Sequence, residues 1–122
     1  MGLDIYFFAR EKDSSQTERT EVGYFRKVNA LIYWIENHVG EVENCEELPV
    51  QRTHLKQMLN DLGTLTSQNC TEVFPTCEGF FFGSSDYDDW YWKDVDEVKA
   101  WCSHILESFD FERRTLVFWA WW

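Results

Sequence analysis

The sequence predicts an α+β domain in which helices pack on one face of a small, mainly antiparallel sheet. Alternating apolar residues near the N-terminus are typical of a strand, and apolar residues at helical spacing indicate amphipathic helices. The wholly apolar segment Leu116–Trp122 predicts a strand inside a sheet or an interface. The expected order of elements is β-α-α-β-α-β, and residues 1–122 are expected to form a single domain.

The first third of the chain is predicted to contain a strand, a loop and a helix. The odd-numbered residues of Leu3–Ala9 are apolar, so this strand should turn them inward. Residues 11–21 are polar and are expected to form a solvent loop. Between Tyr24 and His38 the apolar residues recur at helical spacing, which predicts one helix that Gly40 stops.

The middle of the chain is predicted to contain one more helix and a long connection. An acidic linker at 41–47 leads through Leu48-Pro49-Val50 into a helix with an apolar face from Leu55 to Leu62. Gly63 should end that helix. Residues 64–77 are rich in Ser, Thr and Asn and are expected to form a loop.

The last third is predicted to hold a strand, a helix and the closing strand. Phe80–Phe82 lie between two glycines, which predicts a short strand. Tyr87–Trp92 is expected to form a short helical turn. Asp94-x-x-Glu97 has the spacing of a capping box, so the longer helix should begin at Asp94.

Charge and hydropathy exclude some classes of protein. The net charge is −11, which argues against direct binding to the phosphates of duplex nucleic acid. An acidic surface instead suits binding to a partner protein with a basic surface. The sequence shows no apolar run of roughly 18–20 residues that would span a membrane. Met1–Tyr6 lacks the positive start and apolar stretch of a signal peptide, so we expect an intracellular protein without membrane contact.

Cysteine and histidine residues show no strong metal motif. In a reducing compartment the four cysteines, Cys45, Cys70, Cys77 and Cys102, are expected to be free thiols that pack as small apolar residues. A zinc site built from the last three with His104 remains an alternative, although the sequence has no Cys-x-x-Cys pair.

Catalytic motifs are equally weak. Ser84 and Ser85 follow a glycine without the spacing of a nucleophile elbow. Asp86, Asp88 and Glu97 have some of the offsets of a calcium loop, but Tyr91 stands where that loop needs glycine. We therefore expect a protein that is not an enzyme and needs no cofactor.

The segment Gly79–Trp92 is the predicted location of function. Its carboxylates and aromatic rings cannot all face one core, so some should lie at the boundary with water. Arg26 is expected to hold an aspartate of this segment or an anionic ligand, and Asn29 to bond a neighbouring loop or a ligand. A plain packing role for the aromatic residues remains the alternative. The predicted binding residues are Arg26, Asn29, Phe81, Tyr87, Asp88, Asp89, Trp90 and Tyr91.

Three blocks of the sequence carry a resemblance to a known family. They are Met1-Gly-Leu-Asp-Ile-Tyr, the segment Glu21–Leu31, and the segment Gly79–Tyr91. In series they resemble small uncharacterised proteins encoded by bacteriophages and prophages, some of which carry a phosphoglycerate kinase label. The resemblance implies phage origin and a location in the host cytoplasm. The kinase label does not fit, because 122 residues are too few for the two lobes of that enzyme.

Two functions follow as hypotheses. The first is an accessory binding protein that inhibits a host or defence protein, of the anti-CRISPR or another anti-defence type, through an acidic and aromatic surface. The second is a small-ligand protein that sequesters a nucleotide signal, with a base stacked on the aromatic rings and polar contacts from Arg26 and Asn29.

Overall fold

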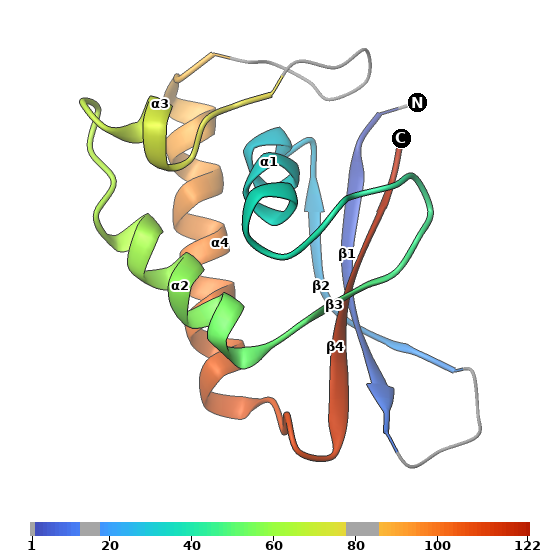
Figure 1. The fold of residues 1–122 in the computed structure, drawn as a ribbon. Coiled ribbons are helices and arrows are strands. Elements are labelled where there is room, and N and C mark those ends of the chain that lie inside the picture. Colours follow the sequence, from blue (N-terminus) through green and yellow to red (C-terminus); the bar gives the residue numbers. More distant parts are fainter. Residues whose placement is uncertain (1, 13–17, 78–85) are drawn as a thin grey trace.

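The computed structural model describes residues 2–12, 18–77 and 86–122, so the predicted strand at Phe80–Phe82 lies outside the described residues. Within them, four antiparallel strands form one sheet in the order β2-β1-β4-β3. Helices cover one face of this sheet (Figure 1). The predicted α+β class is confirmed. The predicted order of elements did not include three that the structure has: β2, β3 and α3.

The two central strands are β1 (Asp4–Glu11) and β4 (Arg114–Trp121), which pair along their whole length. Three inward-facing residues are fully buried, as the alternation predicted: Leu3 just before β1, and Ile5 and Phe7 within it. β4 lies between β1 and β3, in the interior position that its apolar sequence predicted, although its Trp121 side chain is 56% exposed.

The predicted helix at Tyr24–His38 is wrong over its first five residues. β2 spans Thr20–Arg26 and pairs with β1, and α1 spans only Asn29–His38. Lys27, with φ 59°, turns the chain between strand and helix. Phe25 is still buried, because the inward face of β2 and the inward stripe of α1 meet the same core. Apolar spacing therefore continued across a change of secondary structure.

A close contact fixes β2 against the longest helix. The Trp101 indole nitrogen donates a hydrogen bond of 2.8 Å to the Val22 carbonyl oxygen. A Cβ placed on Gly23 would lie 2.5 Å from that indole nitrogen, so only glycine leaves room for the ring.

The middle of the chain contributes an edge strand and two helices. β3 (Leu48–Val50) pairs with β4, where the sequence predicted only a lead into the next helix. α2 (Arg52–Gly63) buries Leu55, Met58 and Leu62, as predicted. The predicted loop at 64–77 contains one short helix, α3 (Cys70–Val73).

The last helix, α4 (Asp89–Ser108), begins five residues before the predicted start at Asp94. Asp88 is its N-cap, and the Asp88 carboxylate accepts a 3.1 Å hydrogen bond from the Tyr91 backbone N–H. The predicted helical turn at Tyr87–Trp92 is thus mostly the first turn of the same helix. α4 packs against α2 through Cys102 and Met58, whose sulfur atoms are 3.4 Å apart.

All four cysteines are free thiols. Cys70 and Cys102 are buried among apolar residues, as predicted, and Cys77 is half-buried. The prediction is wrong for Cys45, which is exposed and has φ 64° in the connection before β3.

Candidate functional site

A cavity of about 260 Å³ lies between the first turns of α1 and α4. Both turns lie at the same end of the molecule, near α3 (Figure 1). Five of the eight predicted binding residues line this cavity, although they come from two segments that are far apart in the sequence: Arg26, Asn29, Asp88, Trp90 and Tyr91. The sequence therefore predicted correctly that the start of α1 and the aspartate-rich segment meet.

The other three predicted residues are not among those that line the cavity. Tyr87 lies beside it, with its ring centroid 4.9 Å from that of Tyr91. Asp89 is exposed on the first turn of α4. Phe81 lies outside the described residues. Whether any of the eight residues binds a partner stays a prediction.

Asn29 is a structural part of the cavity wall. Its side chain is 3% exposed, and its amide oxygen accepts a 3.3 Å hydrogen bond from the Cys77 backbone N–H. The Cys77 thiol donates a second bond, also 3.3 Å, to the Asn29 carbonyl oxygen. A bond from Asn29 to a neighbouring loop, one of its two predicted roles, is confirmed. Burial raises the pKa of Cys77 to about 11, so its thiol stays protonated at neutral pH.

Two tyrosines hold the same connection against α4. The Tyr91 hydroxyl donates a 2.7 Å hydrogen bond to the Phe74 carbonyl oxygen, and the Tyr87 hydroxyl accepts a 3.1 Å bond from the Thr76 N–H. Burial also raises the pKa of Tyr91, so its hydroxyl remains a donor. Residues 74–77 are thus bonded to both helices, which gives the cavity a fixed wall.

Asp94 is the lining residue with the most unusual charge environment. Its carboxyl group is partly buried, and burial raises its pKa to about 6, with further contributions from the negative charges of Glu97 and Asp88. No hydrogen bond to this carboxylate occurs among the described residues, in contrast to the capping carboxylate of Asp88. The cavity therefore contains a carboxylate whose charged form would be stabilised by a hydrogen-bond donor or a nearby positive charge.

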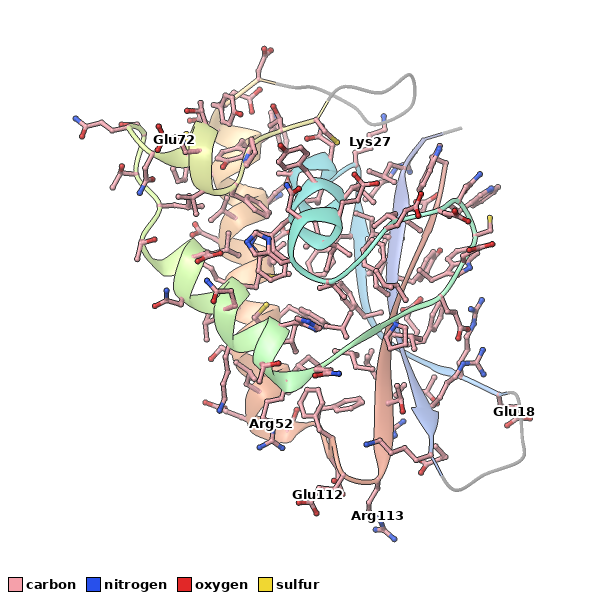
Figure 2. All side chains as sticks on the ribbon, viewed as in Figure 1. Glu18, Lys27, Arg52, Glu72, Glu112 and Arg113 are labelled. Atoms are coloured by element: carbon pink, nitrogen blue, oxygen red, sulfur yellow. The ribbon has the colours of Figure 1, made fainter. Side chains whose placement is uncertain are left out.

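The basic lining residues Arg26 and Lys27 extend toward Gly2. The Lys27 Cε and Arg26 Nη2 atoms lie 3.4 Å and 3.9 Å from the position that a Cβ on Gly2 would take. Gly2 does not line the cavity. Figure 2 shows Lys27 on the side of α1 that is remote from α4 in this view. An ion pair between Arg26 and an aspartate of the acidic segment, which the sequence analysis considered, is not found within the described residues.

Next to the cavity opening lies an exposed segment that we call the acidic aromatic edge: Asp86, Tyr87, Asp88, Asp89 and Trp90. All five residues are exposed. The Trp90 side chain is 70% exposed, the highest value among the large hydrophobic residues that the structure describes. The Lys93 Nζ atom lies 5.3 Å from the Trp90 ring centroid, close enough for a cation–π contact.

Comparisons with known proteins add no assignment: no family model, no curated protein and no solved structure matches the chain. The resemblance to phage proteins therefore still depends on the three sequence blocks alone.

Metal binding and membrane insertion find no support in the part of the chain that the structure describes. No group of three His, Cys, Asp or Glu side chains there could hold a metal ion. No helix among the same residues is long and apolar enough to cross a membrane.

Sequence reasoning missed Asp94 as a lining residue because it assigned Asp94 to the start of a helix. With α4 beginning at Asp89, Asp94 follows Trp90 and Tyr91 by four and three residues, which places the three on one side of the helix. The Asp88-Asp89 pair before Trp90 was the available signal for the earlier start, since aspartate is a strong N-cap residue.

Proposed function

We propose that the chain is a non-enzymatic binding protein whose acidic aromatic edge docks on a basic surface of another protein. The observation that carries this proposal is the 70% exposure of Trp90, which follows three nearby aspartates, Asp86, Asp88 and Asp89. Exposure of a large apolar ring to water is unfavourable, and tryptophan is one of the residue types enriched among the dominant contacts of protein interfaces.

Hydrogen bonds also hold the acidic aromatic edge in place. Asp88 caps α4, and the Tyr91 and Tyr87 hydroxyl groups hold residues 74–76. A surface that is already ordered before binding loses little conformational entropy when the partner arrives. This favours a preformed docking surface.

The charge of the whole chain supports the same class of partner. A net charge of −11 attracts a basic protein over long distances and speeds its association at low salt. We propose that the partner is a host or defence protein with a basic nucleic-acid groove, that the chain inhibits it by covering this groove, and that both act in the host cytoplasm. The phage setting of this proposal depends on the resemblance of the sequence blocks.

Nucleotide binding is the second candidate, favoured by a cavity that has an aromatic ring at its edge. Two observations make it weaker. The Arg26 and Lys27 side chains extend toward Gly2, and the Asn29 amide oxygen is already bonded to the Cys77 backbone N–H. Of the two groups expected to hold a nucleotide, the Asn29 oxygen is therefore already bonded, and the Arg26 side chain extends toward Gly2. A thermal-shift screen with nucleotides tests this candidate.

Affinity capture from a host lysate tests the protein-binding function, with the wild-type chain and two tryptophan variants. Trp90→Ala removes the proposed anchor, and Trp121→Ala is a matched control because Trp121 is 56% exposed at the end of β4. The proposal expects one stoichiometric, salt-sensitive partner that binds the wild type and Trp121→Ala and is lost with Trp90→Ala. Capture that is unchanged by Trp90→Ala, or absent for the wild type in defence-competent hosts, contradicts it.

A further inference from the structure

We propose that the cavity between α1 and α4 receives an arginine side chain of the partner protein. This inference rests on the proposed function, because it names the group with which a basic partner would enter the site. The acidic aromatic edge lies at the opening of the cavity, and Asp88, Trp90 and Asp86 belong to both. A chain segment that docks on the edge can therefore place one side chain inside.

The carboxylates of the cavity favour a positive charge. Asp86, Asp88 and Asp94 all line it on the side of α4. Asp88 is engaged by the Tyr91 N–H, whereas the partly buried Asp94 carboxylate accepts no hydrogen bond within the described residues. A guanidinium group donates two parallel hydrogen bonds to a carboxylate and is more weakly hydrated than an ammonium group, which suits a partly dry site.

The opposite wall includes two basic residues, Arg26 and Lys27. Both side chains extend toward Gly2, which is not a lining residue. The N-terminal end of α1 adds a partial positive charge near Asn29 and Ala30, which would keep a bound cation on the α4 side, close to Asp94. The three carboxylates of the cavity thus lie on the side of α4, and the N-terminal end of α1 lies on the other side.

The aromatic residues and the size also fit an arginine side chain. Phe74, Trp90 and Tyr91 line the cavity, and a planar guanidinium group stacks on such rings. At about 260 Å³ the volume lies just below the roughly 300–1,000 Å³ that is usual for drug-sized ligands. This size suits one side chain better than a whole nucleotide.

Titration with short blocked peptides tests the inference. The probes are acetyl-Gly-Arg-Gly-amide, the same peptide with lysine, and the same peptide with citrulline, which has the shape of arginine without its charge. Amide NMR shifts report where each peptide binds. We expect millimolar binding of the arginine peptide with shifts at Asn29, Tyr91 and Asp94, weaker binding of the lysine peptide, and no binding of the citrulline peptide.

Two variants with the same change in charge locate the effect. Asp94→Asn removes the proposed acceptor and should weaken arginine binding by roughly tenfold. Asp96→Asn is the control, because Asp96 is exposed on the same helix, and it should leave binding unchanged. Equal binding of arginine and citrulline peptides, equal effects of both variants, or a nucleoside monophosphate that displaces the arginine peptide would overturn the inference.

The outcomes separate this inference from the proposed function. A captured partner that is lost with Trp90→Ala but retained with Asp94→Asn supports the docking edge and refutes the arginine site. A partner that is insensitive to Trp90→Ala refutes the edge, whatever the peptides do.

Discussion

Replacement of Asp94 by asparagine should stabilise the protein at neutral pH and leave it unchanged near pH 4. Burial raises the pKa of this carboxyl group from 3.8 to about 6. The folded state therefore binds a proton more tightly than the unfolded state, and stability falls as the pH rises through this window. Asparagine resembles the protonated carboxyl group in shape and carries no charge at any pH, so the variant escapes this loss.

The size of the effect follows from the shift. Each pKa unit corresponds to about 1.4 kcal/mol, so the full shift would cost the wild type about 3 kcal/mol above pH 6. Because Asp94 is only partly buried, water screens part of this cost, and we expect about 1–2 kcal/mol. The other charges close to Asp94 are Asp88, Lys93 and Glu97, which both proteins share.

Urea unfolding at a series of pH values from 4 to 7.5 measures this difference. The free energy of unfolding of Asp94→Asn minus that of the wild type should be near zero at pH 4, rise between pH 4 and 6, and then stay constant. Asp96→Asn, with the same change in charge at an exposed position, should show no such rise. A difference that is independent of pH, or an Asp94→Asn variant that is less stable at pH 7, would refute the burial argument.

Two further substitutions test the contact between β2 and α4 and the cap of α4. Gly23→Ala should destabilise the fold by about 1–3 kcal/mol in urea unfolding, because its Cβ would lie 2.5 Å from the Trp101 indole nitrogen. Gly63→Ala, whose Cβ would have no atom within 4 Å, should change stability little, and a similar loss in both would contradict this reading. Asp88→Ala should cost about 1 kcal/mol by removing the cap of α4, and amide exchange at Tyr91 should accelerate. Unchanged exchange there would show that the cap contributes nothing.

The two central strands, β1 and β4, could be predicted because their signals are local. The alternation in Leu3–Ala9 reflects burial of one face, the apolar run at Leu116–Trp122 reflects a position inside the sheet, and the structure confirms both strands. β3 is different: three residues that include Pro49 become a strand only because β4 offers an edge to pair with. Pairing of this kind depends on the tertiary structure and leaves no periodic pattern in the sequence.

The boundaries of the helices were less predictable, and the errors share a cause. Apolar spacing reports which residues face the core, and it cannot show where a strand passes into a helix when both face the same core. This explains why Tyr24–Arg26, the last residues of β2, were predicted as the first turn of the helix, whereas Thr20 and Glu21 were predicted to lie in a loop. At α4, two overlapping cap signals compete, and the structure uses Asp88 instead of Asp94.

The candidate site was predictable in part. Composition alone indicated that the residues around Trp90 should lie at the boundary with water, and the exposure of the acidic aromatic edge agrees with this. The role of Asn29 in bonding Cys77 was one of two expected alternatives. The raised pKa of Asp94 could not be predicted, because it arises from burial between elements that are distant in the sequence.

The dissociation constant of the purified partner for Trp90→Ala and for Trp121→Ala tests the docking edge most directly. Isothermal titration should show that Trp90→Ala weakens binding by at least about 30-fold, corresponding to roughly 2 kcal/mol for a dominant interface residue. Trp121→Ala should bind like the wild type. Equal constants for Trp90→Ala and the wild type would contradict a docking surface centred on Trp90.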